Sequence, residues 1–139
     1  MKKSQKNILW FKEISSKDVL LVGGKNASLG EMYSRLTQKG INVPDGFALT
    51  TNAYGEFLKE NKIDETLQEI LQKFDPESLE SLQETGKKAR ALFLKAKFPE
   101  DLKKEIIKAY QILEKKYGKG TEVAVRSSGV AEDAPTMSF

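Results

Sequence analysis

The sequence of 139 residues contains neither cysteine nor histidine. Without cysteine, this chain cannot form disulfide bonds, use thiolate chemistry or ligate zinc through sulfur. Without histidine, it cannot carry a Ser-His-Asp triad, a histidine metal site or a phosphohistidine. Apolar runs are also short, because no stretch approaches the roughly 18–20 residues that cross a membrane, and no long apolar segment follows the first lysines. We therefore expect a cytoplasmic protein that does not bind membranes.

Arginine is scarce, with 3 residues against 20 lysines. The formal net charge of +3 equals the contribution of Lys2, Lys3 and Lys6, and residues 7–139 contain as many acidic as basic side chains. The zero net charge of residues 7–139 and the small number of arginines argue against a nucleic-acid-binding surface. The length and the apolar fraction of 39% suffice for one core, so we expect about one domain.

The first part of the chain, residues 8–58, is rich in glycine and small residues and is expected to be α/β. Apolar runs predict strands at residues 8–11 and 47–49. An apolar stripe with helical spacing at residues 29–36 predicts a helix that ends near Gly40.

Two helix starts are predicted in the same part. Ser15 and Asp18 have the spacing of a capping box. Thr51 or Asn52 is expected to cap a helix that buries Tyr54 on its apolar face, together with Phe57 and Leu58.

The next part, residues 62–117, has three apolar stripes with helical spacing and is expected to form three helices. The last part, residues 118–139, begins with a turn. The β-branched residues at 121–126 predict a strand, and a polar loop of small residues follows it.

The first candidate site is the sequence Gly23-Gly24-Lys25 before the helix predicted at 29–36. Glycines let backbone N–H groups approach an anion, a helix N-terminus favours negative charge, and Lys25 could reach a phosphate. The pattern is neither a Walker A loop nor GxGxxG. Alone, it favours the alternative, which is a tight turn with Lys25 in solvent.

The second candidate site is Arg126, at the end of the strand predicted at 121–126, with Ser127 and Ser128 after it. An arginine there could hold a phosphate bidentately while hydroxyl groups and loop amides add hydrogen bonds. Pairing with a carboxylate, Glu132 or Asp133, is the alternative, and both remain open. These two acids could also hold Mg²⁺, but an ordinary acidic loop explains them better.

Three motifs occur in a fixed order: VGGKNASLGEM at 22–32, GINVPDGFALTTNAY at 40–54 and VAVRSSGVAEDAP at 123–135. Together they resemble the N-terminal part of the phosphoenolpyruvate synthases (pyruvate, water dikinases). Pyruvate phosphate dikinases and rifampin phosphotransferases share the same ATP-binding domain. The resemblance spans roughly residues 8–139 and matches the helical part by pattern more than by residue.

The resemblance implies that residues 1–139 are a partial N-terminal ATP-binding domain, the first lobe of an ATP-grasp-like α/β fold with a three-helix segment. Within it, residues 8–58 would be the Gly-Gly-Lys α/β part, 62–117 the helical part, and 118–139 a strand with a truncated phosphate loop. It also implies that Lys25 and Arg126 contact the phosphates of ATP, with Ser127 and Ser138 contributing less. No metal ligand and no catalytic residue is expected in this chain.

Two departures from the family pattern stand near the end of the sequence. Only Ser138 and Phe139 remain of a loop of the form S-F-A-G-Q that covers the phosphates in the family. Thr136 and Met137 stand where an acidic or small residue followed by alanine is expected. The chain therefore looks like a fragment.

The main functional hypothesis is the ATP-binding portion of a Mg²⁺-dependent phosphotransferase that passes phosphate from ATP through a histidine to pyruvate. Pyruvate would bind only through domains that this chain lacks, so the fragment alone is expected to be inactive. One alternative is the ATP lobe of a related phosphotransferase with another acceptor. The other is a free-standing, non-catalytic helical module that binds a partner.

Overall fold

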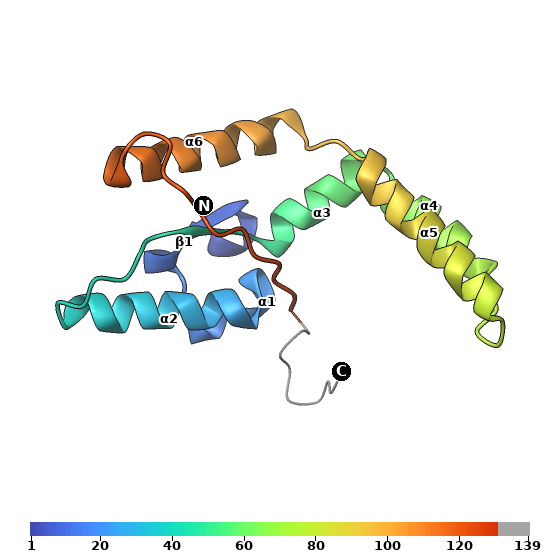
Figure 1. Ribbon diagram of the computed structural model, residues 1–139, viewed down its shortest axis with the longest axis horizontal. Coiled ribbons are helices and arrows are strands. Elements are labelled where there is room, and N and C mark those ends of the chain that lie inside the picture. The colour runs from blue at the N-terminus through green and yellow to red at the C-terminus, as the bar shows by residue number, and fades with distance from the viewer. Residues whose placement is uncertain (131–139) are drawn as a thin grey trace. The chain divides into compact units, whose positions relative to one another are not determined.

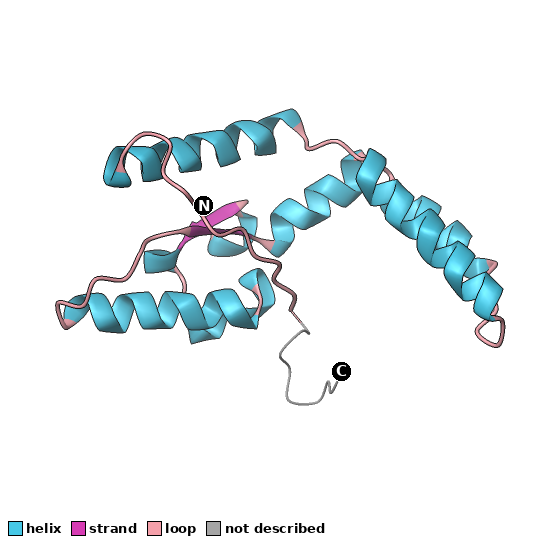
Figure 2. Ribbon diagram, viewed as in Figure 1, coloured by secondary structure: helices cyan, strands magenta, loops and turns pink. Residues whose placement is uncertain are grey.

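The computed structural model describes residues 1–130 as a mixed α/β chain that is mostly helical (Figures 1 and 2). Its elements in chain order are η1 (Lys3–Gln5), β1 (Ile8–Trp10), η2 (Phe11–Glu13), η3 (Ser16–Asp18), α1 (Val19–Val22), α2 (Gly24–Gln38), β2 (Phe47–Leu49), α3 (Thr51–Glu60), α4 (Ile63–Gln72), α5 (Leu79–Lys95) and α6 (Glu100–Tyr117), where η marks a short 3-10 helix. The predicted helices and the strand predicted at 47–49 are thus confirmed. The strand predicted at 8–11 is also present, but it ends at Trp10 because Phe11 begins η2.

The two strands form a small antiparallel sheet in which Leu9 lies opposite Ala48. The neighbouring pair Trp10 and Phe47 brings two aromatic rings to 5.4 Å between centroids. Each strand has only three residues, so the sheet depends on apolar packing around it.

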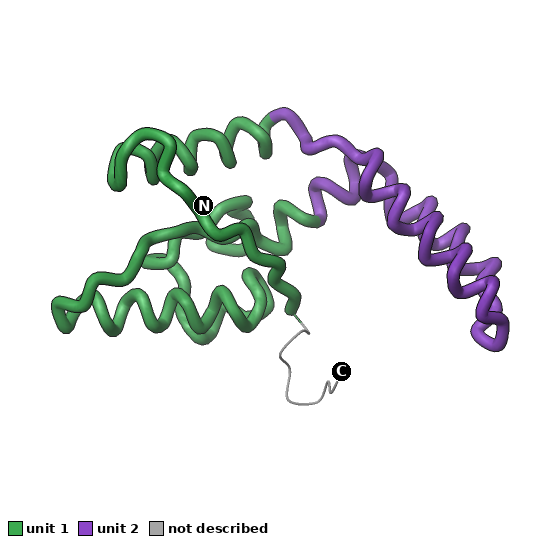
Figure 3. The backbone as a smooth tube through the Cα atoms, in the orientation of Figure 1, with its two compact units in different colours: residues 1–54, 101–139 green, residues 55–100 purple. Residues whose placement is uncertain are grey.

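The chain divides into two compact units (Figure 3). The first comprises Met1–Tyr54 and the chain from Asp101 onward, and the second is Gly55–Glu100. The helices predicted at 62–117 are therefore divided between them, with α4 and α5 in the second unit and nearly all of α6 in the first.

The first unit has a core built from β1, β2, α1, α2 and the turns between them. Its buried cluster consists of Leu9, Ile14, Val22, Ala27 and Ala48, against which Phe11, Val19 and Leu21 pack. The capping box predicted from Ser15 and Asp18 is present: Asp18 accepts hydrogen bonds from the Ser15 backbone N–H at 2.8 Å and its hydroxyl at 3.1 Å. This box fixes the start of the segment that leads into α1.

The second unit is a helical hairpin of α4 and α5 with the last turns of α3. Phe57 packs on Phe93 and Phe98, at 6.4 and 5.7 Å between ring centroids. Asn61 exchanges two hydrogen bonds with the backbone of Lys97, at 2.9 and 3.0 Å, and so ties the base of the hairpin.

Three local predictions are wrong. Residues 121–126 form no strand, since no strand of the described chain pairs with them by hydrogen bonds and β propensity cannot replace that pairing. Thr50, not Thr51 or Asn52, caps α3, and its hydroxyl accepts from the Ala53 N–H at 3.3 Å. Tyr54 is 55% exposed rather than buried.

Candidate functional site

Gly23 forms the turn between α1 and α2 in a backbone conformation that L-residues rarely adopt, with φ +81° and ψ 163°. Its N–H donates to the Val19 carbonyl at 2.8 Å and closes α1. Its own carbonyl accepts from the Ala27 N–H at 3.0 Å and opens α2. The turn predicted at Gly23-Gly24 is thus the junction of two consecutive helices.

The segment containing Arg126 returns to this same turn, as Figure 1 shows for the chain that leaves α6. The hydroxyl of Ser128 donates to the Val22 carbonyl oxygen at 2.8 Å. A Cβ atom placed on Gly23 would lie 2.3 Å from the Ser128 hydroxyl oxygen and 2.9 Å from the Gly129 carbonyl oxygen. Two motifs that are far apart in the sequence therefore meet in contact so close that only glycine fits.

The Val22 carbonyl is a shared acceptor at this junction. Besides Ser128, the side-chain amide of Asn26 donates to it at 2.8 Å. Sequence reasoning did not assign these roles to Asn26 and Ser128. The only signal for Asn26 is its spacing of four residues from Val22, which suits a side-chain bond to a helical carbonyl.

The N-cap of α2, Gly23, makes no side-chain cap hydrogen bond, and the first turn of this helix contains no acidic residue. The helix has 15 residues, so its N-terminus carries the partial positive charge typical of anion-binding helix starts. Lys25 is the second residue of α2, and its side chain is exposed. These features together favour a negatively charged group at the Gly23 junction.

Arg126 lies two residues before Ser128 and is exposed, as is Ser127. Within residues 1–130, no ion pair involves Arg126. Ser138 and the two acids at 132 and 133 lie outside the described residues. The structure therefore brings the segments of Lys25 and Arg126 together through Gly23 and Ser128. The phosphate contact expected of Ser138 and the alternative pairing of Arg126 with Glu132 or Asp133 stay predictions.

No three acidic, histidine or cysteine side chains in residues 1–130 gather as a metal site would require. Among the same residues, no helix has the length and apolar character needed to cross a bilayer.

The sequence profile of the family described as pyruvate phosphate dikinase, AMP/ATP-binding domain, matches residues 19–139. This match covers most of the chain and includes both segments that meet at Gly23. The chain belongs to this family of nucleotide-binding domains.

Curated relatives with the same domain are named phosphoenolpyruvate synthase. The chain is 47% identical to the one from Synechocystis over 137 residues, 46% to that from Helicobacter pylori over 133, and 38% to that from Escherichia coli over 132. Each alignment covers 95% of this chain but only 16–17% of the relative. The chain therefore spans about a sixth of the length of these relatives.

Proposed function

We propose that the Gly23 junction binds the phosphates of ATP. The observation that carries this proposal is the contact of Gly23 with Ser128 and Gly129, which holds the Gly-Gly-Lys turn and the Arg126 segment side by side. Lys25 would act as a point charge, and Arg126 as a bidentate donor. Ser127 and Ser138 would add lesser contacts, the latter from outside the described residues.

The proposed reaction follows from the named relatives and the resemblance. The protein to which this chain belongs would convert ATP, pyruvate and water into AMP, phosphoenolpyruvate and phosphate through a phosphohistidine. Since this chain has no histidine, the phosphohistidine and the pyruvate site would lie elsewhere in a longer protein. The 139 residues would form the first lobe of an ATP-grasp-like domain in a cytoplasmic protein. Alone, they would be inactive, because the phosphohistidine and the pyruvate site would be missing.

The contribution of this chain to the reaction is electrostatic. Phosphoryl transfer needs the charge on the phosphate oxygens neutralised both in the bound nucleotide and as charge shifts in the transition state. Lys25, Arg126 and the N–H groups that begin α2 supply that positive potential. Mg²⁺ is proposed as the ion that accompanies ATP, and residues 1–130 contain no acidic cluster to which its ligation can be assigned.

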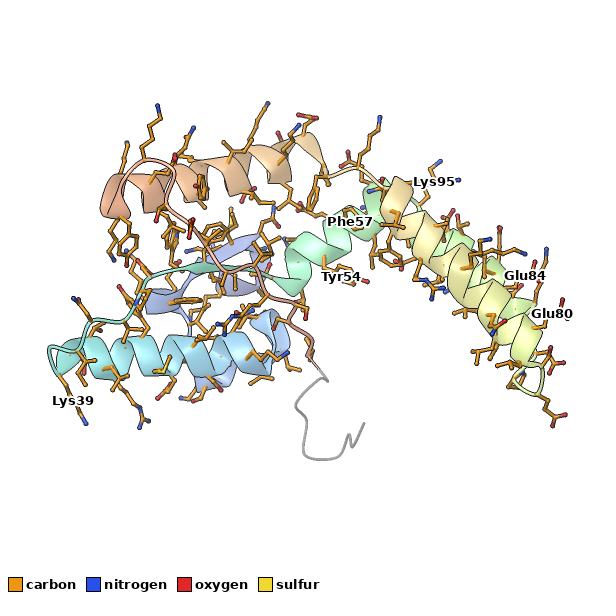
Figure 4. All side chains as sticks on the ribbon, viewed as in Figure 1. Lys39, Tyr54, Phe57, Glu80, Glu84 and Lys95 are labelled. Carbon is orange, nitrogen blue, oxygen red and sulfur yellow. The ribbon has the colours of Figure 1, made fainter. Side chains whose placement is uncertain are left out.

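The test uses the protein encoded by the complete reading frame that contains this chain. Lys25→Ala and Arg126→Ala should each lower the rate of ATP-dependent phosphoenolpyruvate formation about 100-fold or more, as the loss of about 3 kcal/mol of transition-state stabilisation requires. Lys39→Ala, at the far end of α2 in Figure 4, and Arg90→Ala, on α5, are the matched controls. Near-normal rates in both site variants would contradict the assignment.

A second candidate keeps the nucleotide site and changes the acceptor. The family match is compatible with it, since the matched domain is described as AMP/ATP-binding, and pyruvate and phosphate appear only in the name of the enzyme that gives the family its name. Assays of the same protein with pyruvate and with a rifamycin distinguish the two, because only the true acceptor should support consumption of ATP.

A further inference from the structure

The chain between α6 and Ser128 has no helix or strand to hold it, yet it carries Arg126. Val123 and Val125 in this stretch are 50% and 93% exposed, so apolar packing does not fix it either. What restrains it are hydrogen bonds at its two ends. One end is the bond from Ser128 to Val22 described above.

The other end is fastened to α6 at two points. The hydroxyl of Tyr110 donates to the carbonyl oxygen of Thr121 at 2.8 Å. The carboxylate of Glu114 accepts from the backbone N–H of Gly120 at 2.9 Å. The stretch from Thr121 to Ser128 is therefore a short tether between two fixed points, and Arg126 lies near its second end.

The last turn of α6 is itself fixed to the rest of the first unit. The ammonium group of Lys116 donates to the Asp45 carboxylate at 3.1 Å and to the Tyr33 hydroxyl at 3.4 Å. The hydroxyl of Tyr117 accepts from the Asp45 N–H at 2.7 Å. The hydrogen bond to Asp45 outweighs burial and raises the pKa of Lys116 above its usual value, so this ammonium stays charged at physiological pH.

We propose that Tyr110 and Glu114 are positioning residues for Arg126. They contact no phosphate themselves. By holding Gly120 and Thr121 on α6, they reduce the number of conformations that the tether can adopt. The binding of an anion by Arg126 therefore loses less conformational entropy. This inference rests on the proposed function, because it assumes that Arg126 binds ATP.

The first test is Tyr110→Phe, which removes one hydroxyl and leaves the ring in place. In the protein from the complete reading frame, the KM for ATP should rise about 2- to 10-fold, the range expected for one net hydrogen bond, with kcat changed less than KM. Tyr54→Phe, at the exposed tyrosine of α3 labelled in Figure 4, is the control and should leave KM unchanged. A KM equal to that of the control overturns the inference.

A double variant separates positioning from general damage. If Tyr110 acts through Arg126, then adding Tyr110→Phe to Arg126→Ala should raise KM no further. If the two effects multiply instead, the hydroxyl acts independently of Arg126 and the inference is wrong.

Glu114 gives a matched pair of substitutions. Glu114→Gln keeps an oxygen acceptor for the Gly120 N–H and should retain most of the affinity for ATP, whereas Glu114→Ala should raise KM like Tyr110→Phe. Equal KM values in the two Glu114 variants would overturn its positioning role.

The outcome for Arg126→Ala alone tells which proposal has failed. If Arg126→Ala changes neither the reaction rate nor the KM for ATP, the proposed phosphate site is refuted, and this inference is refuted with it. If Arg126→Ala is impaired while Tyr110→Phe matches its control, only the positioning role is refuted.

Discussion

The hydroxyl of Ser128 lies 2.8 Å from the carbonyl oxygen of Val22, a residue 106 positions earlier in the chain. This hydrogen bond joins the turn that begins α2 to the segment that carries Arg126. It places the second segment against Gly23, where a side chain of any size would collide with it. The candidate phosphate site therefore depends on a non-local contact between two loops.

Gly23→Ala should destabilise the first unit by about 2 kcal/mol or more, because the positive φ is strained for alanine and the added methyl meets Ser128 and Gly129. The fluorescence of Trp10, the sole tryptophan, reports this during urea unfolding. The control is Gly55→Ala, in the interior of α3 with open space around it, which should stabilise α3 by about 0.5–1 kcal/mol. If Gly23→Ala has the stability of the wild type, the close contact of Gly23 with Ser128 and Gly129 is contradicted.

Ser127 and Ser128 should behave differently although they are neighbours. Ser128→Ala removes the bond to Val22 and should cost about 1 kcal/mol of stability in urea unfolding. Both residues are exposed, but the Ser127 side chain makes no hydrogen bond within residues 1–130, so Ser127→Ala should leave the stability unchanged. If Ser127 contacts phosphate, its alanine variant should weaken ATP binding without that loss of stability. If Ser127→Ala lowers the stability and Ser128→Ala weakens only the binding of ATP, the roles assigned to the two hydroxyls are wrong.

Acid should weaken the first unit partly through Asp18. Burial alone would raise the pKa of this carboxyl, but hydrogen bonds from Lys3 and Ser15 outweigh it and hold the pKa below its usual value. A lowered folded-state pKa contributes stability above pH about 4 that disappears as the pH falls through the folded value.

Asp18→Asn should therefore cost about 1 kcal/mol at pH 7, a typical value for a capping residue, and flatten the loss of stability below pH 4. Urea unfolding followed through Trp10 at pH 7 and pH 3 measures both effects. Glu60→Gln, at an exposed carboxylate at the end of α3, should keep the wild-type pH dependence. If Asp18→Asn loses as much stability between pH 7 and pH 3 as the wild type does, the role of this carboxyl is refuted.

Local features were predictable from the sequence, and non-local ones were not. The capping box at Ser15, the helix after Gly24 and the two short strands follow from residue spacing over a few positions. The pairing of residues 8–10 with 47–49 depends on the fold between them, which local periodicity does not encode.

The wrong prediction at residues 121–126 has the same origin. Residues 121–126 have the β-branched composition of a strand, but a strand needs a hydrogen-bonded partner, and no strand of the described chain pairs with them. Likewise, Ser127 and Ser128 look equivalent in sequence. Only the return of the chain to Val22 shows that the second of them packs against the glycine turn.

Binding of ATP to the isolated chain should raise its thermal stability, because a ligand that binds only the folded state adds about 2.7 kcal/mol at 100 times its dissociation constant. Thermal unfolding followed through Trp10 fluorescence should show a melting temperature that rises with the concentration of MgATP in the wild-type chain and in Lys39→Ala. This rise should be reduced in Lys25→Ala and in Arg126→Ala, since each removes one positive charge from the proposed site. If millimolar MgATP shifts none of these proteins, the 139 residues do not bind the nucleotide by themselves. If it shifts all four equally, ATP binds at a place other than the Gly23 junction.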